Sequence, residues 1–214
     1  MKITSARLFG ICFILSFVSY AIGMGLMETV ENKTTLIIGA LLIAILHTLF
    51  NLGLLIVMFN VLKSINKSLS IFYLLLGSFG TLMLTLGAIF LLLPISISET
   101  LVQTDQHDSS LFSMILDLSS RGNFYAYQLG MILWGCGGLV FCNLLYKSRL
   151  VPVLFPIWGF MGYLIFIVGC GLELFGKPYG VMLSIPGGLF EILLSIWLVT
   201  KGFNNGVVIT KVNH

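Results

Sequence analysis

The chain has 214 residues, of which 58% are hydrophobic and only 9% are charged, against roughly 25% charged residues in an ordinary soluble domain. A mean hydropathy of +1.07 reflects several apolar runs, each long enough to cross a hydrocarbon core of roughly 30 Å as a helix. This composition excludes a soluble globular domain and indicates a polytopic membrane protein. We attribute the net charge of +3 to membrane anchoring, so it predicts no nucleic-acid partner.

Six apolar runs predict an all-α fold, a bundle of six transmembrane helices that forms a single integral membrane domain over residues 1–214. Turn-forming and charged residues separate the runs. Transmembrane strands are excluded, because the runs are too long and lack two-residue alternation. The predicted spans cover about 8–27, 36–59, 70–93, 123–146, 150–173 and 181–200.

A polar break separates the third span from the fourth, and its second part, about 109–121, has a helical apolar stripe. Leu111, Ile115 and Leu118 lie on one face, whereas Asp117 and Arg121 lie on the other and are spaced to pair. We expect a short amphipathic helix at the outer interface that ends at Gly122. Two interpretations stay open: a lid over an outward-facing cavity, formed with Asp117 and Arg121, or a surface helix that only connects two spans.

The basic residues predict the orientation of the spans. With a cytoplasmic N-terminus, eight basic residues lie inside and three outside, which is a positive-inside bias. The inner residues are Lys2, Arg7, Lys63, Lys67, Lys147, Arg149, Lys201 and Lys211, and the outer ones are Lys33, Arg121 and Lys177. We therefore expect both termini on the cytoplasmic side.

Glu191 stands in the apolar run "IPGGLFEILLSIW", where a charged side chain costs on the order of 2.5–3.5 kcal/mol at the membrane centre. At about 1.5 Å per residue, Glu191 lies roughly 15 Å and His47 roughly 16 Å from the outer ends of their spans. The two residues are therefore level. This matched depth is the basis of our hypothesis that Glu191 and His47 pair by a hydrogen bond or an ion pair.

Other polar side chains inside the spans could complete such a site. The candidate ligand-binding residues are Glu191, His47, Asn51, Thr81, Thr85, Tyr20 and Gln128. Alternatively, each of them bonds a neighbouring helix, and the cluster only holds helices together. Pro186, just before Gly187 and Gly188, predicts a kink in the last span that either lines a polar cavity or has no role.

No catalytic residue, metal site or cofactor is predicted. The four cysteines lie inside spans without CxxC spacing, and His47 is the only histidine within a span, so zinc and haem sites are not supported. Hydrolase, zincin and nucleotide-binding motifs are absent from the sequence.

The stretch "NLLYKSRLVPVLFPIWGFMGYL", together with Glu191 and "IWLVTKGF", resembles the uncharacterised bacterial membrane-protein family known as domain of unknown function 4386. The resemblance covers nearly the whole chain, and Arg7 and Gly10 agree with it more loosely. It implies a six-span protein of the bacterial plasma membrane and implies no activity.

Three functional classes stay open. The leading hypothesis is a protein that binds or transports a small or lipid-like molecule in an outward-facing cavity, with Glu191 and His47 as its polar floor. The second is a structural or accessory subunit without a ligand, which docks an oligomeric or membrane partner through its glycine-rich faces. The third is an intramembrane enzyme that uses Glu191 as an acid or base, although the sequence offers it no nucleophile or metal.

Overall fold

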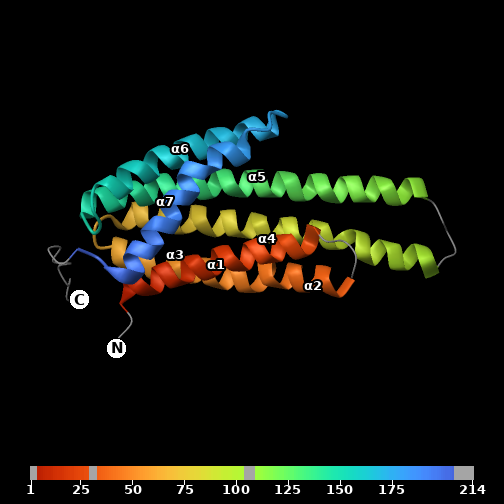
Figure 1. Cartoon of the computed structure of the whole chain (residues 1–214), viewed down its shortest axis with the longest axis horizontal. Helices are drawn as coiled ribbons and strands as arrows, with labels where there is room; N and C mark the ends of the chain where they lie inside the picture. The colour runs from red at the N-terminus through yellow and green to blue at the C-terminus, as the bar shows by residue number, and fades with distance from the viewer. Residues whose placement is uncertain (1–3, 29–32, 104–108, 205–214) are drawn as a thin grey trace.

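The computed structural model describes residues 4–28, 33–103 and 109–204, with no strand among them. The main helices are α1 (Ser5–Glu28), α2 (Lys33–Leu41), α3 (Thr48–Leu62), α4 (Lys67–Gln103), α5 (Ser109–Ser148), α6 (Leu154–Leu174) and α7 (Gly180–Thr200). A short π-helix, η1 (Leu42–His47), joins α2 to α3 without a break in the rod. The helices form an elongated bundle (Figure 1).

Six helical rods in the described residues are long and apolar enough to cross a membrane, as predicted. Their outward surfaces carry large apolar side chains, for example Phe17, Leu49, Phe79 and Val168, each more than half exposed. Contiguous apolar surface of this kind is stable in lipid, where every helix satisfies its own backbone hydrogen bonds. The chain is therefore a multi-pass membrane protein.

The π-helix η1 widens the middle of the second span, and no sequence signal predicted it. The Thr48 hydroxyl donates to the carbonyl of Ile43, five residues back, at 3.2 Å. A π turn changes which residues share a helix face, and such turns are frequent at functional sites. Because η1 ends at His47, it sets the direction of the imidazole.

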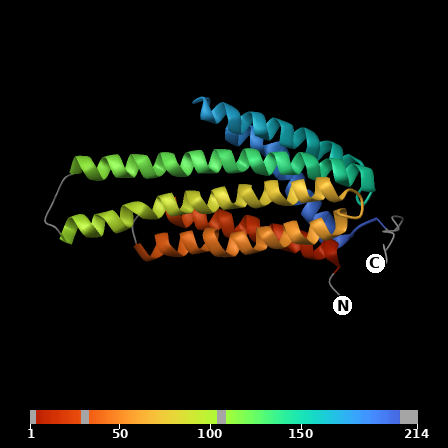
Figure 2. The same ribbon diagram turned by 180° about the vertical axis from the view of Figure 1, so that it is seen from behind.

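Helices α4 and α5 are much longer than predicted, with 37 and 40 residues. At about 1.5 Å per residue each is roughly 55–60 Å long, twice the hydrocarbon thickness. The two helices run side by side beyond the rest of the bundle (Figures 1 and 2).

The segment 109–121 forms the first turns of α5 instead of a separate helix. Gly122 does not end it, because this glycine is a contact point: an added Cβ would overlap the ring of Phe90 on α4. Asp117 and Arg121 do pair, at 2.7 Å, but both are exposed on the projecting part of α5. The lid interpretation of this pair stays a prediction.

Close glycine contacts hold the helices together. Gly80 on α4 and Gly130 on α5 face each other, and a Cβ on either would lie within 3.0 Å of the other's carbonyl oxygen. On α6 and α7, a Cβ at Gly162 would lie 3.0 Å from the Cα of Gly187. Small residues at such crossings let membrane helices approach closely, since packing is a main source of their association.

Helix α7 crosses the bundle obliquely and continues through Pro186. Near its C-terminal end it contacts α1, where a Cβ at Gly10 would lie 2.6 Å from the Ser195 carbonyl oxygen. Its N-terminal half packs on α6 instead, with Leu183 against Gly169. Helices α1 and α7 therefore diverge from a close contact (Figure 1).

Candidate functional site

The Glu191 carboxyl group accepts hydrogen bonds from two aromatic residues on other helices. The Trp134 indole on α5 donates to Oε1 at 2.8 Å, and the Tyr163 hydroxyl on α6 donates to the same oxygen at 2.7 Å. No described residue hydrogen-bonds the second oxygen, Oε2. Glu191 thus has partners other than the predicted His47, and half of its acceptor capacity is unused within the described chain.

Gly138 positions the hydroxyl group of Tyr163 that donates to Glu191. The Tyr163 ring lies against Gly138 of α5, where any side chain would overlap it. The ring also meets Phe190 edge-on, with ring centroids 5.8 Å apart. Because Tyr163 is only 4% exposed, its rotamer is fixed by packing, and the hydroxyl is held on Glu191.

His47 belongs to a separate hydrogen-bond chain that links three helices. Its Nδ1 lies 2.9 Å from the Ser16 hydroxyl oxygen and 3.1 Å from the Ser16 carbonyl oxygen on α1. The Ser16 hydroxyl donates to Asn51 Oδ1 at 3.2 Å, and Asn51 Nδ2 donates to the Thr81 hydroxyl on α4 at 2.8 Å. Thr81 in turn donates to the Gly77 carbonyl, so this chain has one direction from α1 to α4.

The direction of this chain assigns the histidine tautomer. A carbonyl oxygen only accepts, and the Ser16 hydroxyl already donates to Asn51, so Nδ1 of His47 carries a proton and donates. Nε2 is then an acceptor in the neutral ring. This atom is buried and has no partner among the described residues.

A cavity of about 210 Å³ joins the two polar groups. Four of the predicted residues line it, namely Glu191, His47, Asn51 and Tyr20. An engineered protein cavity of about 150 Å³ binds benzene, so this one has room for a somewhat larger organic molecule. A smaller space of about 20 Å³, which shares Trp134, Tyr163 and Glu191 with it, is about the size of one water.

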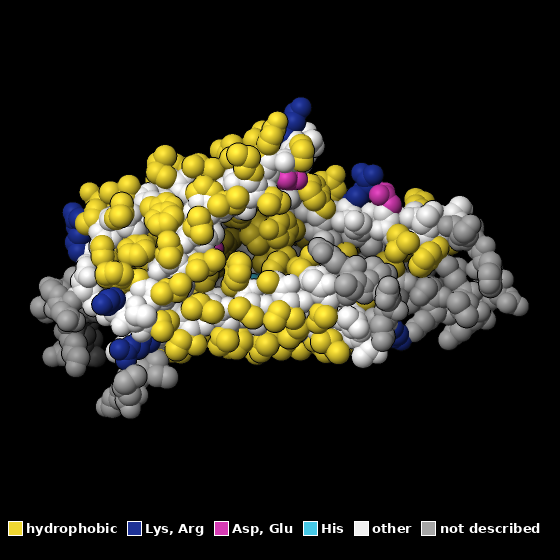
Figure 3. All heavy atoms as spheres, in the orientation of Figure 1, with side chains coloured by type: hydrophobic (Ala, Val, Ile, Leu, Met, Phe, Trp, Pro, Cys, Tyr) yellow, Lys and Arg dark blue, Asp and Glu magenta, His cyan; other side chains and the backbone are white. Residues whose placement is uncertain are grey.

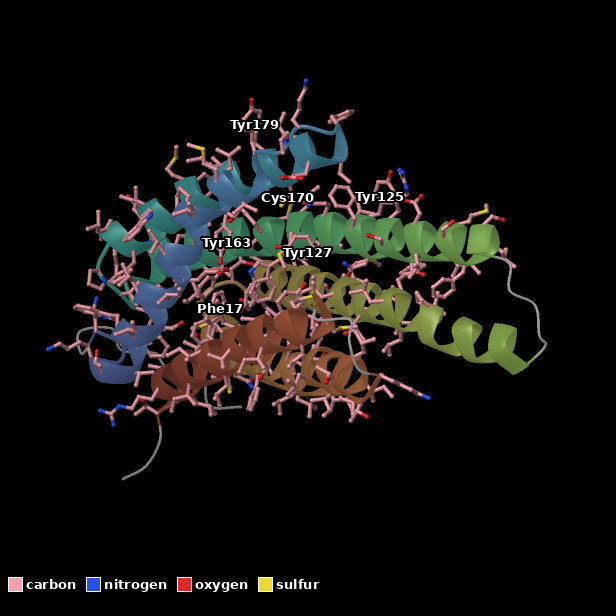
Figure 4. All side chains as sticks on the ribbon, turned by 45° about the vertical axis from the view of Figure 1, so that its right-hand side comes forward. Phe17, Tyr125, Tyr127, Tyr163, Cys170 and Tyr179 are labelled. Atoms are coloured by element: carbon pink, nitrogen blue, oxygen red, sulfur yellow. The ribbon has the colours of Figure 1, made fainter. Side chains whose placement is uncertain are left out.

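Aromatic side chains dominate the wall of the cavity. Seven of its sixteen lining residues are aromatic, and none is a lysine or an arginine. The Tyr20 ring lies 5.1 Å from the His47 ring and stacks on Tyr127, with centroids 6.4 Å apart. Figure 4 shows Phe17, Tyr127 and Tyr163 gathered where α7 crosses α5 and α1, whereas Tyr125 and Tyr179 lie outside. The aromatic members are Phe13, Phe17, Tyr20, Tyr127, Trp134, Tyr163 and Phe166.

The cavity opens on the flank of the bundle. Figure 3, seen across the helix axes, shows a hollow between apolar side chains of α1 and the α6–α7 pair. Phe17 on α1, which lines the cavity, is 51% exposed, and Gly188 on α7 is half-buried. A Cβ at Gly188 would meet nothing within 4 Å. Because this flank is apolar, we expect the opening to face lipid.

Three of the predicted residues do not line this cavity. Thr81 accepts a hydrogen bond from Asn51. Thr85 shares a 3.0 Å hydrogen bond with Thr48 and donates to the Thr81 carbonyl. Gln128 is buried on α5 with its Oε1 unpaired within the described residues. For the two threonines this geometry favours the structural interpretation, because their hydroxyls hold α3 against α4.

Trp134 and Tyr163 are site residues that the sequence analysis missed. A signal for them was present: both stand in the interior of their spans, far from the interfaces that favour such residues. A buried indole or phenol usually needs a hydrogen-bond partner, and Glu191 is an acceptor at the same level. Ser16, the link between His47 and Asn51, was absent from the predicted set as well.

The described residues define a multi-pass helical membrane protein with a carboxyl group and an imidazole on one internal cavity. The chain belongs to the family described as Domain of unknown function (DUF4386), whose family model matches residues 8–202. This match confirms the resemblance found in the sequence. No curated protein and no solved structure matches the chain.

Proposed function

We propose that the protein binds a small or lipid-like molecule in the cavity between α1, α5, α6 and α7, as a binding or transport protein. The observation that carries this proposal is Oε2 of Glu191, which has no hydrogen bond from a described residue and belongs to a side chain that lines a cavity of about 210 Å³. Oε2 is not among the buried side-chain atoms that lack a partner, so it is accessible from the cavity. A ligand in the cavity that donates to Oε2 gains a hydrogen bond to a carboxyl oxygen, and such bonds contribute about 1.5–3 kcal/mol when the group is charged.

A structural or accessory subunit is the second candidate. It is favoured by the chain of hydrogen bonds through Ser16, Asn51 and Thr81, which stabilises the contacts of α1, α3 and α4 without any ligand. An intramembrane enzyme has less support, because no cysteine lines the cavity and the Ser16 and Ser184 hydroxyls already donate to Asn51 and the Val181 carbonyl.

Filling the cavity with a side chain tests the proposal. Gly188 lies on the same helix face as Ser184 and Glu191, and its Cβ position is open. We expect Gly188→Phe to occupy the cavity without disturbing a helix contact. Mass spectrometry of the protein purified in mild detergent should find a small molecule or lipid bound to the unmodified chain and depleted about tenfold or more in the variant, a loss of at least about 1.4 kcal/mol.

Gly171→Phe is the matched control, because the Cβ position of Gly171 on α6 is also open and Gly171 does not line this cavity. This variant should retain the molecule at the level of the unmodified chain. If nothing is retained by any of the three proteins, or if both variants retain the same amount, the structural role of the second candidate is the better account.

A further inference from the structure

The charges and rings around Glu191 point to a chemical class of ligand. We infer that the cavity binds an organic ammonium group, presented from the lipid phase, with Glu191 as its counter-charge and the aromatic wall around it. This inference rests on the proposed function and specifies its ligand.

The two donors on Oε1 of Glu191 favour its ionised form, which can take a positively charged partner. An indole N–H can only donate, and a phenol bonded to the same oxygen completes a site with two donors on Oε1. Such bonds are strongest when the acceptor is ionised. The lining residues include no lysine or arginine, so an ionised Glu191 has no cation beside it in the described chain.

The aromatic wall supports the same ligand class. Cations bind over aromatic faces at up to about 6 Å from the ring centre, and aromatic cages recognise quaternary ammonium groups. Trp134 and Tyr163 point their polar edges at Glu191, so the faces for a cation come from the other lining rings, among them Phe17, Tyr20 and Phe166. An alcohol or a neutral amide also donates to Oε2 but gains nothing from these rings.

An inorganic cation fits this site less well. Sodium, calcium and magnesium are held by several oxygen ligands, whereas the cavity offers one carboxyl group in an aromatic surround. No group of three histidine, cysteine or acidic residues that could hold a metal ion occurs in the described part of the chain.

The position of the opening indicates the route of entry. The hollow lies on the apolar flank between α1 and α7 (Figure 3), with Phe17 and Gly188 on its lining. An amphiphile in the membrane can therefore place its ammonium group inside the cavity and leave its apolar part in lipid. The ammonium group belongs either to a lipid headgroup or to a smaller amine dissolved in the membrane.

Trp134 provides a fluorescent reporter inside the site. The chain has three tryptophans, and the other two, Trp158 and Trp197, line a different surface hollow near Lys201. The double variant Trp158→Phe and Trp197→Phe therefore leaves Trp134 as the only indole. Calorimetric titration of the unmodified chain gives the same affinities without any substitution.

Three probes of similar shape separate charge from size: benzylammonium, whose N–H groups can donate to Oε2, its uncharged carbon isostere ethylbenzene, and the anion phenylacetate. We expect the cation to bind about tenfold more tightly than the isostere, as a cation–π contact with a counter-charge provides, and the anion to give no binding. Glu191→Gln should bring the ratio of cation to isostere close to one. Gly188→Phe should weaken the binding of both the cation and the isostere, and Gly171→Phe should weaken the binding of neither.

Equal affinities of cation and isostere in the unmodified chain would overturn the inference. If both still depend on Gly188, the cavity binds ligands and only the ligand class is wrong. If no probe depends on Gly188, the proposed function fails together with the inference.

Lipid composition distinguishes the two sources of the ammonium group. In nanodiscs of phosphatidylethanolamine, a lipid headgroup that occupies the site should compete with the cationic probe and weaken its apparent affinity relative to nanodiscs of an uncharged galactolipid. Equal affinity in the two kinds of nanodisc assigns the site to a smaller amine.

Discussion

Replacing Gly138 with alanine is expected to lower the free energy of unfolding by about 2 kcal/mol, within the range of added methyl groups in packed cores. The new Cβ would overlap the ring of Tyr163, which also packs edge-on against Phe190. We expect the ring to shift and its hydroxyl to leave hydrogen-bond distance of Glu191. The variant should therefore lose both stability and bound ligand.

Gly137→Ala is the matched control for this change. Gly137 is the neighbouring residue on the same helix, and its added Cβ would meet Gly77 and Leu76 at 3.4 Å, an ordinary contact. We expect it to unfold within about 0.5 kcal/mol of the unmodified protein, as substitutions without a specific mechanism do. Reversible unfolding in mixed micelles measures both variants, and equal stability of the two would contradict the assigned position of Tyr163.

Replacing Gly10 with leucine is expected to have the larger effect, a loss of about 3 kcal/mol or more, because backbone cannot yield to a side chain as another side chain can. An added Cβ would lie 2.6 Å from the Ser195 carbonyl oxygen of α7. The substitution must push α1 and α7 apart at the contact from which they diverge. The cavity between them should then widen and bind its ligand less tightly.

Gly10→Ala and Gly53→Ala form the comparison for this contact. Gly53 on α3 also faces α1, but its added Cβ would come no closer than 3.8 Å to Cys12. Measured in one detergent, the melting temperature should be highest for Gly53→Ala, lower for Gly10→Ala and lowest for Gly10→Leu. If Gly10→Leu melts with the unmodified protein, α1 and α7 do not meet at this point.

Burial depth was predictable from the sequence, because a span of known direction fixes the level of each residue at about 1.5 Å per residue. Glu191 and His47 were placed level in this way, and they line one cavity. Their partners were not predictable, since depth does not say toward which neighbour a helix face turns. The π turn that ends at His47 also changes which residues share a helix face, and no residue pattern predicted this turn.

Glycines and aromatic residues were harder to interpret than charges. A glycine such as Gly122 is typical of a helix end, but here it is the point where α5 contacts Phe90. Only the position of α4 distinguishes these two roles. Trp134 and Tyr163 fit equally well as apolar packing residues until an acceptor is placed beside them. In both cases the role depends on how one helix is rotated relative to its neighbour, and the sequence does not determine that rotation.

An experimental density map of the protein in lipid nanodiscs would show whether a ligand occupies the cavity. We expect density that belongs to no protein atom, inside the cavity between α1 and α7 and within hydrogen-bond distance of Oε2 of Glu191. If protein side chains close the cavity and one of them bonds Oε2, no ligand binds there, and Glu191 is a structural contact between helices.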